Sequence, residues 1–333
     1  MNILLVKLSS LGDVVHTLPV VQDLHAALPG AQLDWVVERP FAPLLGACPG
    51  VRRVIPCELR RWRRSPWSAA TRAAWRAFRA DLQAQAYDAV IDLQGLSKSA
   101  LVAALSRLAP GGQRYAMAHG TDGSGYEAPT RWVADVKVSL PRHVHAVERG
   151  RLLCARALGY TPAELPDFGL GTAAPQAGPV LLVHGSSRAD KLWPHEHWLE
   201  LGQRLLAAGH SLALAHGSDA ELAASQALAQ AWSQGEKVVV WPRMPLDQLL
   251  QAMAGCAGVV GVDSGLSHIA VALDLPHVQL YNFDTAWRTG PPAAGRSGAR
   301  AWQRSLFGQP APAVEAVWAA WQACWAARAQ AAA

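Results

Sequence analysis

Short apolar runs alternate with amphipathic stretches along the first half of the chain. An apolar run of about four to eight residues is typical of a buried strand, and apolar residues recurring every three or four positions are typical of a helix. The runs predict strands at residues 3–8, 32–37, 51–56 and 87–93. The longer repeats predict helices at residues 14–28, 68–85, 97–108 and 145–158. This alternation predicts a parallel sheet with helices on both faces.

The pattern stops at residues 159–179, which are rich in Gly, Pro, Ala and Thr, and then starts again. The second series predicts strands at residues 179–184, 211–215, 237–241, 258–262 and 277–281. It predicts helices at residues 195–208, 219–232, 246–254 and 266–273. Residues 283–310 show no period, and residues 313–328 predict a last helix with three tryptophans at helical spacing. We therefore expect an α/β protein with two units joined by a linker.

The length of 333 residues also favours two domains, since single cores stop growing at roughly 250–300 residues. We expect an N-terminal domain over residues 1–165, a C-terminal domain over residues 166–310 and a final helix over residues 311–333. In sheets of this kind, ligands bind where the carboxyl ends of the strands meet. The cleft between the two domains is therefore the expected active site.

Composition narrows the class of protein. With 51% hydrophobic and 17% charged residues, the chain is too apolar to be disordered. No run reaches the ~18 consecutive apolar residues of a membrane-spanning helix. The first residues lack the basic start and the cleavage site of a signal peptide. The five cysteines are scattered without a CxxC pair, so we expect a cytoplasmic protein with reduced thiols.

The first motif with chemical potential is KLSSLGDVVHTLP, residues 7–19, where the first strand meets the first helix. Backbone N–H groups at such a junction can bind an anion, and Gly12 permits a tight turn. Asp13 falls in the first turn of the helix, at the edge of the expected cleft. The helix macrodipole alone is a sufficient reason for an acid at this position. The motif lacks GxGxxG, so it does not support a dinucleotide site.

The second motif is VHGSSRADKLWP, residues 183–194, which follows the first strand of the second domain. The hydroxyls of Ser186 and Ser187 and the charge of Lys191 suit phosphate oxygens. The motif is not a GxxxxGK[ST] loop, and an ordinary loop leading into a helix cap is the alternative.

The third motif is GVDSGLSH, residues 261–268, where another strand runs into a helix. The first-turn N–H groups of that helix would face any ligand bound there. His268, one turn into the helix, could reach the same ligand. Capping of the helix by Asp263 or Ser264 explains these residues equally well.

The densest positive charge lies in LRRWRR, residues 59–64. Further arginines flank this segment at Arg52, Arg53, Arg72, Arg76 and Arg79. Three tryptophans lie among them at Trp62, Trp67 and Trp75. A solvated basic face is one interpretation. The other is an anionic partner, namely a phosphorylated lipid, a membrane surface or a nucleic acid, with tryptophans anchored in lipid or stacked on bases.

Two pairs of histidines lie in HVH, residues 143–145, and HEH, residues 195–197. Neither pair has an evident third ligand, and the HExxH pattern is absent. We therefore expect no metal site.

Together the motifs resemble those of the lipopolysaccharide core heptosyltransferases, glycosyltransferase family 9. YDAVIDLQGLSKSA, residues 87–100, and HAVER, residues 145–149, add to the ordered set. The resemblance covers essentially the whole chain and is nearest to the members that add the first heptose. It implies a GT-B fold, in which two Rossmann-like domains face a central cleft and a C-terminal helix packs back on the N-terminal domain.

The resemblance also implies an activity. The enzyme would transfer L-glycero-D-manno-heptose from ADP-heptose to a Kdo residue of Kdo2-lipid A, with inversion of the anomeric centre. ADP-heptose is a substrate, and neither a cofactor nor a metal is implied. The expected place is the cytoplasmic face of the inner membrane of a Gram-negative bacterium, with peripheral contact to that membrane. No nucleic-acid partner is expected, and the oligomeric state is left open.

Residue roles follow from the same resemblance. Asp13 matches the catalytic base and Lys191 a catalytic contact to the diphosphate. The implied donor-binding residues are Ser186, Ser187, Lys191, Glu221, Met244, Asp263, Ser264, Gly265 and His268. The implied acceptor-binding residues are Ser10, Gly12, Arg60, Arg61, Arg63, Arg64 and Lys98. Family members commonly read YGPTDP after the last strand, whereas this chain reads YNFDTA from Tyr281, which leaves sugar selection open.

Within the donor set, Glu221 matches an acid near the ribose and Met244 a residue lining the adenine pocket. Asp263 matches a position near the heptose hydroxyls, and His268 one near the phosphates.

Two alternatives remain at this point. The chain could add a second heptose to an acceptor that already carries one, although the segment 59–64 favours the first transfer. It could instead be a noncatalytic module that binds an anionic lipid or a nucleic acid, which the arginines and tryptophans permit. A binding module, however, has no use for Asp13 opposite a phosphate site.

Overall fold

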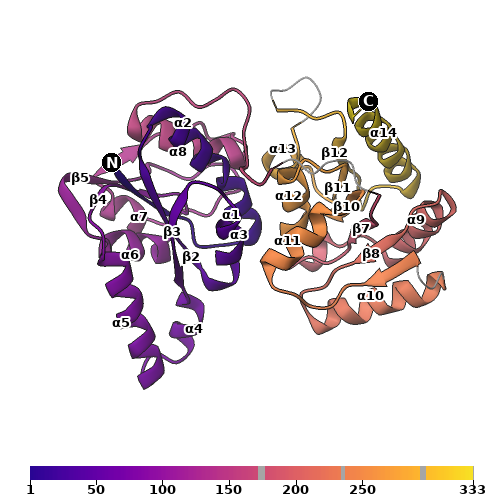
Figure 1. Ribbon diagram of the computed structural model, residues 1–333, viewed down its shortest axis with the longest axis horizontal. Coiled ribbons are helices and arrows are strands. Elements are labelled where there is room, and N and C mark those ends of the chain that lie inside the picture. Colours follow the sequence, from indigo (N-terminus) through magenta and orange to yellow (C-terminus); the bar gives the residue numbers. More distant parts are fainter. Residues whose placement is uncertain (172–176, 234–236, 293–297, 333) are drawn as a thin grey trace. The chain divides into compact units, whose positions relative to one another are not determined.

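The computed structural model describes residues 1–171, 177–233, 237–292 and 298–332. The chain divides into two compact units, Met1–Gly169 and Leu170–Ala333 (Figure 1). The division falls within the predicted linker at residues 159–179, of which residues 172–176 lie outside the described residues.

The first unit is built on a parallel sheet of six strands. The strands are β1 (Asn2–Val6), β2 (Gln32–Glu38), β3 (Val51–Cys57), β4 (Tyr87–Asp92), β5 (Leu108–Met117) and β6 (Val136–Val138). The helices are α1 (Leu11–Thr17), α2 (Pro19–Ala27), α3 (Ala42–Gly46), α4 (Leu59–Arg64), α5 (Ala69–Gln83), α6 (Ser97–Leu105), α7 (Pro129–Val133) and α8 (Ala146–Leu158), with a 3-10 turn at Arg39–Phe41. The spatial order of the strands is β3-β2-β1-β4-β5-β6.

The second unit is built on another parallel sheet of six strands. The strands are β7 (Val180–Val183), β8 (Leu212–Leu214), β9 (Val238–Val240), β10 (Gly258–Val262), β11 (His277–Tyr281) and β12 (Gln303–Phe307). The helices are α9 (His195–Ala207), α10 (Asp219–Trp232), α11 (Leu246–Ala254), α12 (Gly265–Ala272), α13 (Ala286–Thr289) and α14 (Val314–Ala332), with a 3-10 turn at Ala189–Lys191. The spatial order is β12-β11-β10-β7-β8-β9.

Both sheets have the same topology. Numbered within its own unit, each runs 3-2-1-4-5-6, which is the order of Rossmann folds. The order reverses between β1 and β4 in the first unit and between β7 and β10 in the second. Ligands of such sheets bind in the crevice at this switch point, beyond the carboxyl ends of the strands. The predicted parallel α/β architecture is confirmed. The topology indicates that a ligand would bind at one edge of each sheet, beyond the carboxyl ends of its strands.

Three strands were not predicted. β5 contains Pro110, Gly111 and Gly112, which read as turn residues, and its pairing with β4 shifts register after Tyr87. β6 is only three residues long. β12 lies in the stretch 283–310 that was expected to be irregular, because it has only five residues and the first three, Gln303, Arg304 and Ser305, are polar.

The single helix predicted over residues 14–28 is wrong. The structure has two helices there, α1 and α2, which meet at Leu18 and Pro19. Proline has no N–H to continue the helical ladder but is accommodated at the first position of a new helix. The apolar positions continue across the break, which is why the periodicity concealed it.

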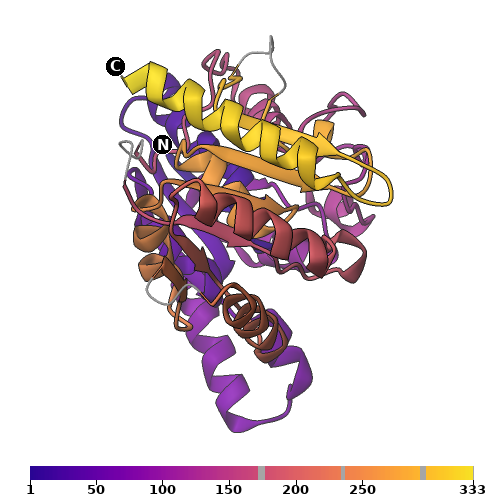
Figure 2. The same ribbon diagram turned by 90° about the vertical axis from the view of Figure 1, so that its right-hand side faces the viewer.

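The return of the C-terminal helix to the N-terminal domain stays a prediction. α14 packs against α9, β11 and β12 within the second unit (Figure 2). Val317, Trp321 and Cys324 recur every three or four residues and are buried in that unit's core. Of the tryptophan stripe noted in the sequence, Trp321 therefore serves the core of its own unit, whereas Trp325 is 37% exposed.

Among the described helices, none has both the length and the apolarity needed to cross a membrane. All five cysteines are free and buried.

A buried ion pair ties α8 to α2 in the first unit. Arg151, 1% exposed at its side chain, donates from Nε and Nη2 to the two carboxylate oxygens of Asp23 at 2.7 and 3.0 Å. Both charges are removed from water, so Asp23 depends on Arg151 for its stabilisation, and Arg151 depends on Asp23 and on Glu148, to which its Nη1 donates at 2.9 Å.

Replacing Asp23 by Ala should lower the free energy of unfolding of the first unit by about 3 kcal/mol, because the buried guanidinium keeps only the half-exposed Glu148 as a carboxylate partner. Asp81→Ala is the control, since Asp81 pairs with Arg53 but is 48% exposed at its side chain. Its removal should cost less than about 1 kcal/mol. Urea denaturation of both variants measures the difference, and equal losses would contradict the account.

Candidate functional site

The carboxyl end of β1 holds a buried lysine beside an acid. Lys7, 3% exposed at its side chain, lies with Nζ 3.4 Å from Oδ1 of Asp13 and donates to the carbonyl oxygen of Leu93 at 3.1 Å. Nη2 of Arg149, on α8, lies 3.8 Å from the same oxygen of Asp13. A buried lysine therefore follows the apolar residues of β1, beside the residue that follows β4.

Asp13 occupies the first turn of α1, as predicted. The backbone N–H and the hydroxyl of Ser10 donate to its Oδ2 at 3.0 and 2.9 Å. Burial acts to raise the pKa of Asp13, but Lys7, the two donors of Ser10 and Arg149 outweigh it and lower the pKa to about 2. The side chain is 36% exposed. Asp13 is thus an ionised carboxylate that a ligand can reach.

The loop after β4 fixes the segment that follows β1. The side-chain oxygen of Gln94 accepts from the backbone N–H groups of Leu8 and Ser9 at 3.0 and 3.1 Å. Nζ of Lys98, on α6, donates to the hydroxyl of Ser9 at 2.6 Å. Two of the predicted acceptor residues, Ser10 and Lys98, therefore belong to one hydrogen-bonded junction with Asp13.

Beneath this junction lies Asp92, the last residue of β4. It accepts from the backbone N–H groups of Gln94 and Gly95 at 2.9 and 3.0 Å and from the hydroxyl of Ser99 at 3.0 Å. Burial dominates over these bonds and raises the pKa of Asp92 to about 6. The two carboxyls near Lys7 therefore have pKa values displaced in opposite directions.

Sequence reasoning gave no role to Lys7, Asp92 or Arg149. Lys7 lies in the quoted motif 7–19 as a charged residue within an apolar stretch, whereas Arg149 closes the motif 145–149 between Glu148 and Gly150. That signal marks a buried charge, but the pairing with Asp13 depends on the packing of α1 against α8.

The predicted basic segment forms α4, which leads into α5. Arg60, Arg61, Arg63 and Arg64 are all exposed, and Arg61 donates to Glu58 at 2.9 Å. Trp62 is buried, and its ring packs 5.5 Å from Trp75 and 5.4 Å from Phe78 between centroids. The idea that Trp62 anchors in lipid is therefore wrong, because this ring holds α4 to α5.

In the second unit, the carboxyl ends of β7 and β10 bring together a second lysine and acid. Nζ of Lys191 donates to Oδ2 of Asp263 at 2.5 Å, and Nε2 of His268 lies 3.4 Å from Oδ1. Burial acts to raise the pKa of Asp263, but His268 and Lys191 outweigh it and hold the pKa well below its usual range. The predicted donor residues Lys191, Asp263 and His268 thus form one ionic cluster.

Ser264 occupies the N-cap position of α12 in an extended backbone conformation. Its hydroxyl is buried and has no hydrogen-bond partner within the described part of the chain. Gly265 begins the helix, so the N–H groups of the first turn lack helical acceptors. Ser186, after β7, donates to the carbonyl oxygen of Asp263 at 3.5 Å. An unused hydroxyl and free amides beside a lysine suit an anion.

The remaining donor residues lie at neighbouring strand ends. Glu221, near the start of α10, accepts from the backbone N–H of Gly217 at 2.6 Å. A Cβ on Gly185 would stand 2.7 Å from the carboxyl carbon of Glu221, so a larger residue there would displace this carboxylate. Met244 is half-buried in the loop between β9 and α11, and Ser187 is exposed.

The altered loop after β11 has a visible structural function. Nδ2 of Asn282 donates to the carbonyl oxygens of Asp190 and Leu192 at 3.0 and 2.9 Å. These bonds hold the segment on both sides of Lys191. The departure from the family pattern therefore contributes to the placement of this lysine.

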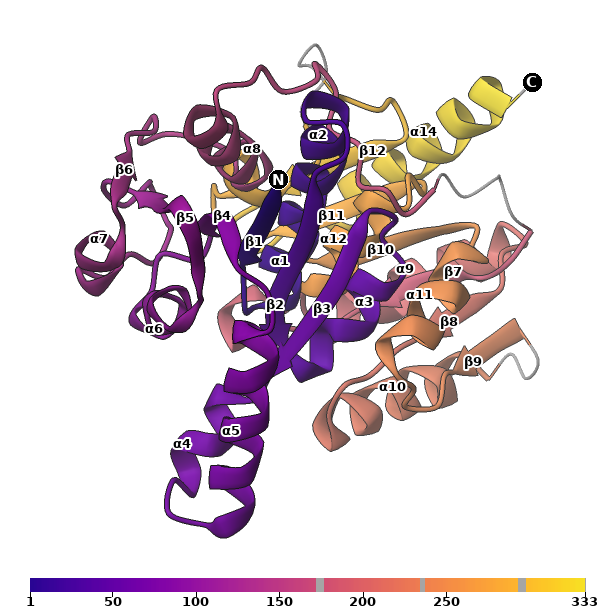
Figure 3. The same cartoon turned by 60° about the vertical axis from the view of Figure 1, so that its left-hand side comes forward.

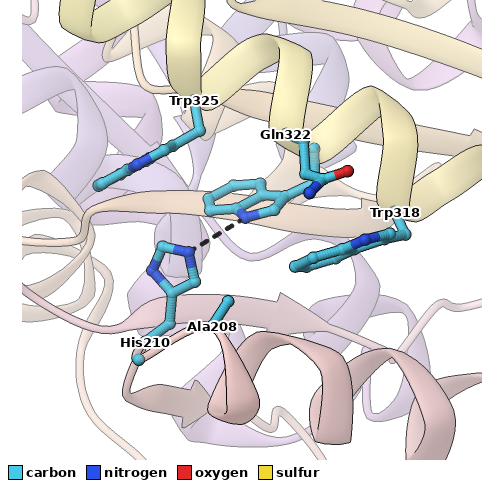
Figure 4. A pocket seen from close by; sticks show the side chains of 7 residues that line it. Ala208, His210, Trp318, Gln322 and Trp325 are labelled. Carbon is cyan, nitrogen blue, oxygen red and sulfur yellow. Dashed lines mark hydrogen bonds between the residues drawn. The ribbon is translucent and has the colours of Figure 1, made fainter.

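A pocket of about 530 Å³ lies elsewhere in the second unit. It is lined by His210 and by Trp318, Trp321 and Trp325 of α14 (Figure 4). His210 precedes β8, so the pocket is near the amino end of the sheet, whereas the predicted donor residues follow the strands. None of those donor residues lines it.

Within the described residues, no three side chains of metal-binding type lie close enough to hold an ion. The need for no metal stays a prediction.

The chain is similar in sequence and structure to known proteins. A family model described as glycosyltransferase family 9 (heptosyltransferase) matches residues 75–305. The chain belongs to glycosyltransferase family 9. It is 41% identical over 292 residues to lipopolysaccharide heptosyltransferase 1 of Escherichia coli (strain K12), covering 84% of this chain and 88% of that protein. Lipopolysaccharide heptosyltransferase 1 of Pseudomonas aeruginosa is 39% identical over 307 residues, covering 89% and 82%.

Other family 9 proteins are more distant. Lipopolysaccharide heptosyltransferase 2 of Salmonella typhimurium is 26% identical over 306 residues, covering 84% of this chain and 82% of that protein.

The solved structure of E. coli heptosyltransferase WaaC with ADP matches with a TM-score of 0.80 and 35% identity over 95% of this chain and 98% of that one. With its two sheets in Rossmann order, this family 9 chain is a glycosyltransferase of the predicted GT-B fold class.

Replacing Lys7 by Met should raise the pKa of Asp13 above its value of about 2, because the strongest attraction to the carboxylate is lost while its burial remains. A ¹³C NMR titration of the aspartate carboxyl carbons measures this shift. Lys137→Met is the control, since Lys137 is exposed on β6, and it should leave the pKa of Asp13 unchanged. An unaltered Asp13 in the Lys7 variant would contradict the proposed coupling.

Proposed function

We propose that this family 9 enzyme transfers L-glycero-D-manno-heptose from ADP-heptose to a Kdo residue of Kdo2-lipid A. The observation that supports it most strongly is the contrast in identity, at 39–41% to heptosyltransferases 1 and 26% to heptosyltransferase 2. Both kinds of relative align over more than four fifths of the chain, so the contrast is not one of coverage.

We infer that Asp13 is the general base. It removes the proton of the acceptor hydroxyl while that oxygen bonds to the anomeric carbon, and the bond from that carbon to the diphosphate breaks on the opposite face. The product is inverted, the proton ends on Asp13, and ADP leaves with the electron pair. Lys7 keeps Asp13 ionised before the step and favours return of the proton to water afterwards.

The donor side must stabilise the charge that develops on the departing diphosphate. Lys191 supplies a full positive charge, and the Ser264 hydroxyl and the first-turn N–H groups of α12 supply oriented donors. Asp263, ionised and fixed by His268, is suited to accept hydrogen bonds from heptose hydroxyls. Glu221 and Met244 are proposed for the ribose and adenine. This set provides the neutralisation for which other glycosyltransferases use a divalent cation, so we propose none.

On the acceptor side, Lys98, Ser10 and Gly12 lie beside the base, and the exposed arginines of α4 carry the charge that suits Kdo carboxylates and phosphates. We propose that the enzyme works at the cytoplasmic face of the inner membrane of a Gram-negative bacterium, where such an acceptor would be presented.

Incubation of the purified protein with ADP-heptose and Kdo2-lipid A should yield a lipid one heptose heavier, as read by mass spectrometry. The matched incubation uses the acceptor that already carries one heptose. Product from the second acceptor alone would replace this proposal with a second-heptose transferase. Product from neither would exclude heptose transfer to this lipid core.

The two charged pairs should separate catalysis from donor binding. Asp13→Ala should lower turnover by a factor of about 10² or more, the usual contribution of a general base, with the affinity for ADP unchanged. Lys191→Ala should weaken ADP binding by about tenfold or more, as expected for a lost charge-assisted bond, and lower turnover with it. Calorimetry with ADP and single-turnover rates measure both.

Arg188→Ala is the control for Lys191, because Arg188 lies on the same loop, is exposed and pairs with Asp190. It should leave both quantities near wild type. Full activity of Asp13→Ala would remove Asp13 as the base, and unchanged ADP affinity of Lys191→Ala would remove Lys191 from the diphosphate site.

A further inference from the structure

A helical hairpin projects from the sheet of the first unit. It consists of α4 and α5, joined by residues 65–68 (Figure 3). α5 has fifteen residues, so it is roughly 22 Å long and carries the joining residues well away from the strands. Trp62, Trp75 and Phe78 pack together inside the hairpin and stiffen it.

The hairpin carries one sign of charge. Residues 59–80 contain seven arginines and no acid. The whole chain has a net charge of +5, so the remainder of the protein is net negative. On α5, Arg72, Arg76 and Arg79 recur every three or four residues and share one exposed face. The modest overall charge thus conceals a strongly basic projection.

At its end the hairpin exposes a large apolar ring. Trp67 is 85% exposed, the most exposed of the large apolar side chains among the described residues. Exposing an indole to water is unfavourable, and the exposed residues Arg63, Arg64 and Arg72 lie close to it in the sequence. Arg72 donates to the carbonyl oxygen of Trp67 and so holds this turn against the start of α5. Tryptophan beside basic residues is the combination found at membrane interfaces.

We propose that the α4–α5 hairpin docks on an anionic phospholipid bilayer, with Trp67 at the headgroup level and the arginines of α5 over the lipid phosphates. The inference deepens the proposed function, since a lipid acceptor has to be reached in its membrane. In this proposal the two parts of the hairpin have different functions. Arg60 and its neighbours on α4 begin at the carboxyl edge of β3, near Lys98, and serve the acceptor, whereas Trp67, Arg72, Arg76 and Arg79 hold the bilayer.

The test uses vesicles without any acceptor, so its outcome is independent of catalysis. Wild-type protein should sediment with vesicles of 70% phosphatidylcholine and 30% phosphatidylglycerol and much less with pure phosphatidylcholine. Binding should fall as salt rises, because the attraction is screened. Failure to bind the anionic vesicles would overturn the proposal, whether or not the enzyme transfers heptose.

Two variants examine the parts of the docking surface. Trp67→Ala should weaken binding to the anionic vesicles by about tenfold, the effect of withdrawing roughly 60 Å² of apolar surface. Arg76→Gln with Arg79→Gln should weaken it by roughly fivefold per charge. Wild-type binding by either variant would refute the role of that part.

Adjacent residues on α7 of the same unit provide matched controls. Trp132 is 72% exposed and Arg131 is exposed. Trp132→Ala and Arg131→Gln should bind vesicles as wild type does, and a loss equal to that of the hairpin variants would indicate nonspecific adsorption. With acceptor dispersed in detergent, Trp67→Ala should keep its turnover. A loss there would show that Trp67 contacts the acceptor itself and not the bilayer.

Discussion

The pairing of β1 with β4, and of β7 with β10, is the constraint on which both halves of the molecule depend. In each sheet these two strands are neighbours in space but not in sequence, and the chain leaves them toward opposite faces. The crevice that results cannot be filled by either crossover helix. Polar backbone groups and charged side chains can therefore lie at that edge of the sheet, because it is outside the apolar core. Function is concentrated where topology leaves room for it.

Each crevice uses its space in the same electrostatic way. In the first unit Lys7 faces Asp13, and in the second Lys191 faces Asp263. The lysine keeps its acid ionised although burial opposes that charge, so both carboxylates act only as acceptors of hydrogen bonds or protons. The lysines differ in accessibility. Lys7 is sealed at 3% exposure and can only tune its neighbour, whereas Lys191 at 22% can turn toward an incoming phosphate. A similar pair thus suits the proposed base in one unit and the proposed anion site in the other.

The sequence predicted most of this arrangement because strands that are buried on both faces appear in it as apolar runs. β1, β4, β7 and β10 were all found in that way, and with them the loops that carry Asp13, Lys191 and Asp263. Elements at the sheet edges were missed, since β6 is short and β12 is part polar. The break at Pro19 and the coupling of Arg149 to Asp13 could not be predicted. Both depend on how helices pack, which a periodic pattern does not specify.

The hairpin is a second case in which the sequence could not predict which side chains are buried. The sequence revealed its arginines but could not say which tryptophan was structural, because Trp62 and Trp67 occur in similar company. Packing separates them. Trp62 is 6% exposed and closes the hairpin, whereas Trp67 is 85% exposed. A buried indole gives the projection the rigidity to hold its charges at a distance from the sheet. In the proposed docking, that rigidity is what would let a net basic tip on an otherwise net negative protein orient the molecule at an anionic surface.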